Sequence, residues 1–418
     1  KENNVFQLVV QYGAGEREFP KLGYAAQLMN NAGIMGAYEP QELKEELSKL
    51  NATCHVTADD DNLYIIMEGY EATLPQACQL LSRQILMPKL DEKQLARLKG
   101  SAMGMRQQRK DNVSILNEAL RQYMLYGEKS DYIKELTDKE IYELQISELT
   151  GDINRASNYE AKVFFTGTLP FDQVYDILSK NLPLVANERP SNSPQAKDMM
   201  PVTENTVYFL PNNDAEQAQI HLYIPMQKAD KKDDVLRSAF NQYFGLDFTG
   251  IVLNEIREKR SMAYTAYAFV GTQGIAGKAS YLRGYIGTQN DKANDALDVL
   301  MGLVNDMPKN PERIDNIKSY LRQAMLTSHP SFRNKAMELV DLGYRGYTDD
   351  PAKENLPKVD ALTFDDIVKF YEENIKDKPY CISIMGNPKN IDLKRLEKFG
   401  KVVKLNERKL FNTKDALF

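Results

Sequence analysis

The sequence predicts an α+β protein of two homologous repeats, each an antiparallel-rich sheet covered by helices on one face. Three observations predict this class: duplicated landmarks, apolar spacings that change between the strand and the helix period, and a polar segment near mid-chain. At 418 residues the chain exceeds one ordinary hydrophobic core, so at least two domains are expected.

The duplication is visible as short motifs that recur in the same order. Three pairs of landmarks lie 219 or 220 positions apart: Met87 with Met307, Gly127 with Gly346, and Gly167 with Gly386. The first pair opens Met-Pro-Lys triplets, and the last pair follows β-like apolar runs. One such match is expected by chance, but three in order indicate an internal repeat.

The boundary between the repeats is predicted from composition. The stretch LPLVANERPSNSPQAKDMMP is rich in Pro, Ser, Asn and charge and has no sustained apolar period. We therefore divide the chain into a first repeat at residues 1–186, a linker at 187–203 and a second repeat at 204–418.

Each repeat mixes the two periods without strict alternation. In the first repeat, apolar residues alternate over 6–12 and 63–67, which predicts strands, and recur at helical spacing over 43–50 and 95–102. In the second repeat the same patterns predict strands at 220–224, 263–270 and 281–287 and helices at 251–259, 293–304 and 312–326. Such an order favours helices packed on one face of a largely antiparallel sheet.

Composition excludes several classes of function. The net charge is −6 and no basic block is present, so nucleic acid is not an expected partner. The longest apolar runs are too short to cross a bilayer, so no transmembrane segment is expected. The first residue is Lys1 rather than Met, from which we expect a processed or excised piece. We expect a soluble chain of the bacterial cytoplasm or periplasm.

Other candidate sites have ordinary structural interpretations. Cys54, Cys78 and Cys381 form no CxxC pattern and are expected as buried free thiols. Three consecutive aspartates at 59–61 are typical of a hairpin turn rather than a cation site. The Gly-rich stretch GTQGIAGKASYLRGYIGTQ lacks phosphate-binding spacing and is expected as an edge hairpin, to which extended peptide could add as a strand.

Two stretches give the chain a family resemblance. YGAGEREFPKLGYAAQLMNNAGI and GLDFTGIVLNEIREKRSMAY resemble the active-site helix region and the second-domain Arg/Tyr motif of pitrilysin/insulinase-type zinc peptidases. Mitochondrial processing peptidase and the core subunits of respiratory complex III are similar chains. The resemblance covers essentially the whole sequence and implies the metallohydrolase-like α/β sandwich of that family.

The zinc site implied by the resemblance is degenerate here. The family's H-x-x-E-H helix presents two His ligands and a Glu general base to one zinc ion. Ala26, Met29 and Asn30 stand at those three positions. The distal Glu ligand is expected near 103–105, yet no acidic residue occurs from 93 to 110. We therefore expect no metal in this chain.

The histidines do not rebuild a metal site. His55 and His221 lie in predicted strands, and His329 precedes a proline in a predicted loop. No two of them have the spacing of three or four that would place both on one helical face. Packed or surface histidines are the interpretation that the sequence favours.

Arg257 and Tyr264 match the family's transition-state residues. In the family the non-catalytic half supplies an Arg and a Tyr that reach substrate carbonyls and the developing oxyanion. Guanidinium and phenol donors aimed at such charge contribute about 2.7–4 kcal/mol each. The alternatives are a solvated ion pair for Arg257, within EIREKR, and a core position for Tyr264. Ser261-Met262 departs mildly from the family motif.

The resemblance thus implies the non-catalytic half of a zinc metalloendopeptidase, inactive alone. Its expected partners are an H-x-x-E-H-bearing half, fused upstream or on a separate subunit, and unstructured peptide substrates. Zinc is expected only in the partner half, and a homodimer through the same surfaces is an open alternative. A rival hypothesis is an inactive scaffold subunit like the core subunits of respiratory complex III.

Overall fold

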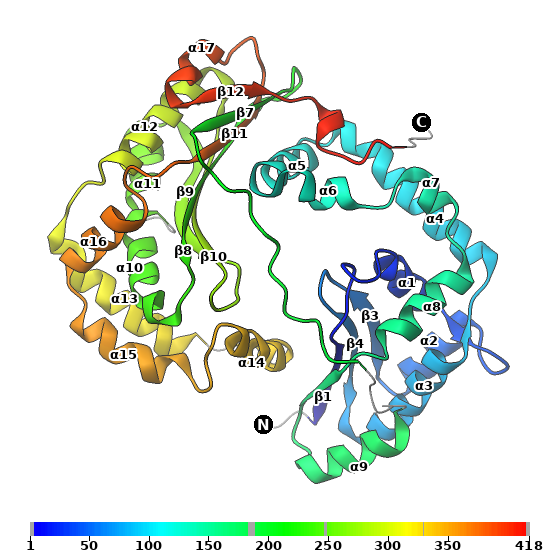
Figure 1. Cartoon of the computed structure of the whole chain (residues 1–418). Helices are drawn as coiled ribbons and strands as arrows, with labels where there is room; N and C mark the ends of the chain where they lie inside the picture. The colour runs from blue at the N-terminus through cyan, green and yellow to red at the C-terminus, as the bar shows by residue number, and fades with distance from the viewer. Residues whose placement is uncertain (1–3, 183–188, 246–248, 329, 415–418) are drawn as a thin grey trace.

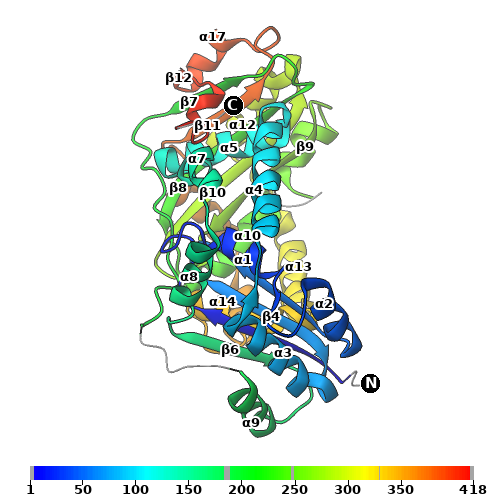
Figure 2. The same ribbon diagram turned by 90° about the vertical axis from the view of Figure 1, so that its right-hand side faces the viewer.

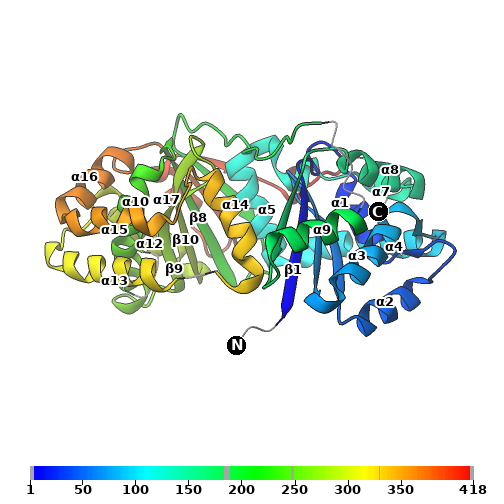
Figure 3. The ribbon, with the colours of Figure 1, turned by 90° about the horizontal axis from the view of Figure 1, so that it is seen from below.

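The computed structural model describes residues 4–182, 189–245, 249–328 and 330–414, without the side chains of Lys110 and Asp111. Two lobes stand side by side, each with a β-sheet on its inner side and most of its helices outside (Figure 1). Seen from below, the two sheets face each other, with α5 and α14 between the lobes (Figure 3). The predicted α+β class with two helix-covered sheets is therefore confirmed.

The first sheet is entirely antiparallel, with strand order β3-β4-β1-β6. Every second residue of β1, from Phe6 to Tyr12, points into the core beneath the helices. Leu8 pairs with Met67 and Val10 with Ile65, so the alternating apolar residues of neighbouring strands share that face. The strands are β1 Val5–Tyr12, β3 Thr53–Ala58, β4 Leu63–Tyr70 and β6 Ala161–Thr166.

Helices cover the outer face of this sheet. Several begin at capping boxes, in which a polar side chain accepts from the third backbone N–H, as Asp91 does from Gln94. With the first repeat toward the viewer, α4 lies upright above α1 (Figure 2). The helices are α1 Leu22–Met29, α2 Pro40–Lys49, α3 Leu74–Leu86, α4 Glu92–Gln107, α5 Val113–Tyr126, α6 Asp131–Lys134, α7 Asp138–Tyr142, α8 Ile146–Ala156 and α9 Phe171–Asn181; β2 Gly33–Ile34 pairs with β5 Pro88–Lys89.

The second sheet has the order β12-β7-β11-β8-β10-β9 and is mixed, because β7 runs parallel to both β11 and β12. Its four strands β9-β10-β8-β11 repeat the order β3-β4-β1-β6 of the first sheet. The strands are β7 Thr206–Pro211, β8 Gln217–Lys228, β9 Ala263–Thr272, β10 Ala279–Gln289, β11 Cys381–Gly386 and β12 Lys401–Lys404. The repeated order agrees with the duplicated landmarks, while the boundaries at 186 and 203 remain predictions.

The helices of the second repeat form a larger core on the outer face of their sheet. The element predicted as one regular helix over 251–259 is instead a short α-helix followed by a π-helical turn. The helical elements are α10 Asp234–Phe244, α11 Ile251–Leu253, the π-turn η5 Asn254–Glu258, α12 Ala293–Asn305, α13 Ile314–Thr327, α14 Lys335–Tyr344, α15 Pro351–Ala361, α16 Phe364–Asn374 and α17 Leu393–Leu396.

The two repeats exchange helices across the interface. Helix α5 of the first repeat packs on the inner side of the second sheet, where Leu116 and Leu120 join Leu210 and Met385 in a small buried cluster. Helix α14 of the second repeat contacts β6 of the first sheet. Each sheet is therefore covered by its own helices on the outer face and is contacted by one helix of the other repeat on the inner face.

The loops confirm two sequence interpretations. Asp59 Oδ1 accepts from the backbone N–H groups of Asp61 and Asn62, at 2.8 and 2.7 Å, which closes the predicted hairpin turn. β9 and β10 form a hairpin, and β9 is an edge strand. The linker residues 189–203 contain no helix and run between the lobes (Figure 1), whereas 183–188 and His329 lie outside the described residues.

The three cysteines are free thiols. Cys78 and Cys381 are buried and Cys54 is half-buried. Burial raises the pKa of the Cys54 and Cys78 thiols to about 12 and that of Cys381 to about 11, so all three remain protonated at neutral pH. In the part of the chain that the structure describes, no helix is long and apolar enough to span a bilayer.

Candidate functional site

The first repeat places the degenerate zinc positions inside its core. Ala26 and Met29 are 2% and 3% exposed, on the face of α1 that packs against β3, α4 and α8. Near the expected distal ligand on α4, Met103 packs against the same core and Met105 is exposed. Apolar contacts therefore surround Ala26 and Met29, which stand where the resemblance expects the first His ligand and the Glu general base.

Asn30 at the end of α1 has a structural partner. Its Nδ2 donates to the carbonyl oxygen of Val56 at 2.8 Å, and its Oδ1 accepts from the Val56 N–H at 2.7 Å. The amide thus satisfies both backbone groups of one residue of β3 and joins the helix to the sheet. Among the described residues, no group of three His, Cys, Asp or Glu side chains is arranged to hold a metal ion.

The described histidines lie in strands, as predicted. His55 is exposed on β3. His221 is buried on the inner side of β8, where its Nε2 lies 3.0 Å from Asn117 Oδ1 of α5. Burial and, to a smaller extent, the charges of Arg283 and Arg121 together lower its pKa to about 3, so this imidazole is neutral at physiological pH.

The second repeat exposes the predicted Arg/Tyr pair at the junction of η5 and β9. The π-turn is closed by the Lys259 N–H, which donates to the Asn254 carbonyl at 2.9 Å. Ile256, within the turn, is fully buried and anchors it to the core. Ser261 then takes a left-handed φ of 49°, and the chain reverses into β9.

This reversal brings Arg257 and Tyr264 together. The guanidinium carbon lies 5.1 Å from the centroid of the phenol ring, a cation–π arrangement. Tyr264 is 78% exposed, so the alternative of a core tyrosine is wrong. Arg257 Nε also lies 3.5 Å from Glu258 Oε1. The ion pair that the alternative interpretation expects for Arg257 is therefore present.

Both side chains line one open depression of about 460 Å³ beside the start of β9. Its other lining residues include Met262, Thr288 and Lys292. Thr288 donates to the Met262 carbonyl, and Lys292 Nζ donates to the Ser261 carbonyl at 3.3 Å. These contacts fix the loop between the Arg and the Tyr, and both loop carbonyls are thereby satisfied.

A carboxylate supports the turn from its outer side. Glu255 accepts from Lys259 at 2.6 Å and from Arg260, and these hydrogen bonds lower its pKa. The sequence reasoning did not identify Glu255, Thr288 or Lys292 as supports. The i,i+4 spacing of Glu255 and Lys259 was a usable signal, whereas Thr288 and Lys292 approach from a distant part of the sequence.

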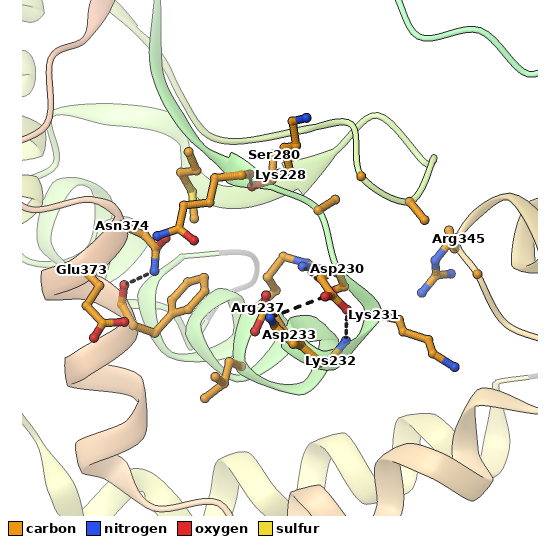
Figure 4. A pocket seen from close by; sticks show the side chains of 18 of the residues that line it. Lys228, Asp230, Lys231, Lys232, Asp233, Arg237, Ser280, Arg345, Glu373 and Asn374 are labelled. Atoms are coloured by element: carbon orange, nitrogen blue, oxygen red, sulfur yellow. Dashed lines mark hydrogen bonds and ion pairs between the residues drawn. The ribbon is translucent and has the colours of Figure 1, made fainter.

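A second depression, of about 730 Å³, lies between the end of β8, α10 and α16 (Figure 4). Within the lining, Lys232 pairs with Asp230 at 3.5 Å and Lys369 with Glu373 at 3.8 Å. Arg237 and Arg345 pair instead with Asp234, which is not among the lining residues. The lining carries six basic and four acidic side chains, so its basic groups are only partly compensated from within.

A family model now connects these observations. Residues 157–321, which include α11, η5 and β9, match the model described as "Peptidase M16 inactive domain". This part of the chain is therefore similar to a peptidase M16 inactive domain. The resemblance to the non-catalytic half of insulinase-type peptidases is thereby confirmed, and no curated protein matches the sequence.

Solved structures share the fold across almost the whole chain. A peptidase M16 inactive domain from Pseudomonas fluorescens is 16% identical, with a TM-score of 0.72, and the match covers 93% of this chain and 94% of that one. The periplasmic protease PqqL from Escherichia coli is 13% identical, with a TM-score of 0.71 and coverage of 93% and 43%.

A third structure, the ferredoxin protease FusC in complex with Arabidopsis ferredoxin, is 12% identical, with a TM-score of 0.73 and coverage of 92% and 42%. This chain therefore spans less than half of the length of the two proteases and nearly all of the Pseudomonas protein. At these identities the likeness establishes the fold.

Proposed function

We propose that this M16 inactive domain is the non-catalytic half of a zinc metallopeptidase. It closes a chamber over unstructured peptide and presents Arg257 and Tyr264 to the zinc site of a partner half. The observation that carries the proposal is the exposed Arg257–Tyr264 pair, 5.1 Å apart and held on a fixed loop. A guanidinium and a phenol side by side can donate to a carbonyl or an oxyanion.

The first repeat also supports the proposal that zinc and the general base belong to a partner half. Ala26 and Met29 are packed in the core and Asn30 is bonded to β3, so the repeat offers no general base at the family's position. Zinc and the attacking water therefore have to come from a partner half with an H-x-x-E-H helix. The chain spans 43% of PqqL and 42% of FusC, which fits one half of a longer peptidase.

Partner and compartment follow from this proposal. The H-x-x-E-H half is either fused upstream or a separate subunit, and pairing of two copies of this chain is the competing arrangement. PqqL is a periplasmic protease, and we place this chain in the bacterial periplasm or cytoplasm.

The test is cleavage of a quenched, unstructured peptide by the assembly of this chain with its H-x-x-E-H half. Tyr264→Phe removes one donor, and we expect kcat to fall about tenfold or more, equivalent to about 1.4 kcal/mol of barrier, with unchanged zinc content. Tyr175→Phe, at a 63% exposed tyrosine on α9, is the matched control.

Equal rates for Tyr264→Phe and Tyr175→Phe would overturn the catalytic proposal and favour the scaffold hypothesis. The isolated chain should cleave nothing, and appreciable hydrolysis by it would contradict the proposed division between two halves.

A further inference from the structure

The inner face of the second sheet carries a group of aromatic side chains outside the helix-covered core. On β9 and β10, Ala266, Ala268, Val270, Leu282 and Ile286 point outward into the core. The residues between them therefore point to the inner side. These inner residues are Tyr267 and Phe269 on β9 and Tyr281, Arg283 and Tyr285 on β10, and all five are half-buried.

The rings form a continuous surface. Tyr267 lies 5.2 Å from Tyr285 and 5.9 Å from Phe269, centroid to centroid, and Tyr285 lies 5.1 Å from His221. Gly271, opposite Tyr281, has no side chain, and a Cβ there would be 3.3 to 3.4 Å from the neighbouring rings. The aromatic rings therefore occupy the space above the strands.

The strand register sets the spacing of this surface. Tyr285 lies directly opposite Tyr267, and Arg283 lies opposite Phe269. Because side chains on one face repeat every second residue, the two cross-strand rows are about 6.8 Å apart. One row is purely aromatic, and the other contains a cation.

Arg283 is the cation, and it lacks a counter-charge. In the part of the chain that the structure describes, no carboxylate forms an ion pair with Arg283, and its buried Nε has no hydrogen-bond partner. His221 Nδ1, also buried, has no partner either. By contrast, Arg121 on the adjacent helix α5 is paired with Glu118.

A buried donor without an acceptor is unfavourable unless a ligand or solvent satisfies it. The imidazole of His221 is neutral, and Arg283 contributes to the lowering of its pKa, so the positive charge of Arg283 is not offset from that side. The chemistry that complements this position is a carboxylate, which can accept more than one guanidinium N–H.

We infer that the inner face of β9 and β10 binds an extended peptide that carries an aromatic side chain two residues from a carboxylate. In an extended peptide, side chains at i and i+2 lie on one face about 6.6 to 6.8 Å apart. That spacing equals the distance between the Tyr267–Tyr285 row and the Phe269–Arg283 row. The aromatic side chain stacks on the first row, and the carboxylate binds Arg283 in the second.

This inference rests on the proposed function, because it makes the surface a specificity site for the chamber's substrate. Tyr267 and Phe269 follow Tyr264 along β9 by three and five residues, or about 10 and 17 Å. The aromatic preference should then fall about three residues from the cleaved bond.

The chain contains no tryptophan, so a Trp in a synthetic peptide reports binding by its own fluorescence. The probe is a twelve-residue Gly/Ser peptide with Trp and Glu at i and i+2, in either order, titrated with the full chain. We expect Arg283→Met to weaken binding about tenfold or more. Arg322→Met, at a half-exposed arginine on α13 paired with Asp360, is the matched control and should bind like wild type.

Peptide variants separate the sources of the carboxylate. If a side-chain carboxylate binds Arg283, replacing Glu by Gln in the peptide abolishes the difference in affinity between wild type and Arg283→Met. If the terminal carboxylate binds, amidation of the peptide C-terminus abolishes that difference. Moving Glu to i+1 places it on the opposite face and should reproduce the Gln peptide. Tyr267→Ala should weaken binding of the Trp peptide more than that of a Leu peptide.

Equal affinities for the Glu and Gln peptides, both C-terminally amidated, would overturn the inference, as would equal affinities of Arg283→Met and Arg322→Met. Melting temperatures of the variants show whether each is folded. Because binding is measured without cleavage, loss of the Arg283 effect is distinguishable from failure of the proposed function, which is tested by Tyr264→Phe in the assembly.

Discussion

Helix α1 of the first repeat is packed into the core, whereas the η5–β9 junction of the second repeat presents polar side chains to an open depression. At α1, Ala26 and Met29 are apolar and buried, and the polar Asn30 is bonded to β3 through both groups of its amide. At the junction, Tyr264 is 78% exposed and Arg257 lines an open depression. The side chains at α1 therefore contribute to the stability of the fold, whereas the phenol of Tyr264 is accessible from solvent.

This difference shows that the two repeats of a duplicated fold can use comparable surfaces in different ways. With Ala26 and Met29 in place, α1 packs like any core helix, because apolar burial is favourable. The exposed Tyr264 gains little from packing, so the proposed role of the pair predicts little cost to the fold when it is replaced.

The largest expected effect comes from returning a charge to α1. Met29→Glu restores the general-base position but places a carboxylate where the side chain is 3% exposed. We expect a loss of about 3–5 kcal/mol in the free energy of unfolding at pH 7, as for an unpaired buried charge. Urea denaturation of Met29→Glu against Met29→Leu measures it, and a loss below that of the Leu control would contradict a closed core.

A smaller but still large effect is expected from Asn30→Ala. This change leaves the N–H and C=O of Val56 without their side-chain partner. An unsatisfied buried group costs about 1–3 kcal/mol, so we expect a loss of about 2–4 kcal/mol. Asn31→Ala is the control, since the exposed Asn31 side chain donates to the nearby Gln27 carbonyl and not to the sheet. Equal stabilities would show that solvent replaces the amide.

Glu16, in the loop that leads into α1, should make stability depend on pH. Burial and, to a smaller extent, the nearby Asp60, Asp59 and Asp131 together raise its pKa from 4.5 to about 7. The folded state therefore binds the proton more tightly than the unfolded state, and this stabilisation is complete below pH 4.5 and is lost as pH rises through 7.

Glu16→Gln should remove that dependence. Relative to wild type, the variant should gain melting temperature between pH 5 and pH 8, which a series of thermal scans would measure. A constant difference across this range would show that Glu16 keeps an ordinary pKa in the protein.

The smallest expected effect on stability is at the exposed junction. Tyr264→Phe and Arg257→Met should each change the free energy of unfolding by less than about 0.5 kcal/mol, because surface substitutions rarely do more. Urea denaturation of each variant measures this. A loss above about 1.5 kcal/mol would mean that the pair supports the fold, and the contrast with α1 would then disappear.

Much of the fold could be predicted from the sequence. The alternation of Phe6, Leu8, Val10 and Tyr12 gave β1, and the order of duplicated glycines anticipated the repeated strand order. The π-turn at Asn254–Glu258 could not be predicted, because a run such as LNEIREK satisfies the ordinary helical pattern equally well. The wider turn depends on how Ile256 and Met262 pack.

The candidate site, too, could be predicted only in part from the sequence. Arg257 and Tyr264 were found from a local motif, but their stacking depends on the reversal at Ser261, which Thr288 and Lys292 hold from a distant segment. Whether the pair serves catalysis remains a prediction. The exchange of α5 and α14 between the repeats was not predicted, since an apolar stripe does not identify its neighbour.

The sequence by itself determined the duplication, the absence of an H-x-x-E-H motif and the residues that face a core, because these follow from residue identity and spacing. Only the tertiary structure decided that Asn30 bonds Val56, that Tyr264 is exposed and that Arg283 stands among aromatic rings without a carboxylate. The reason is physical: periodicity reports that a face is buried, whereas the partner on that face comes from chain segments far away in sequence.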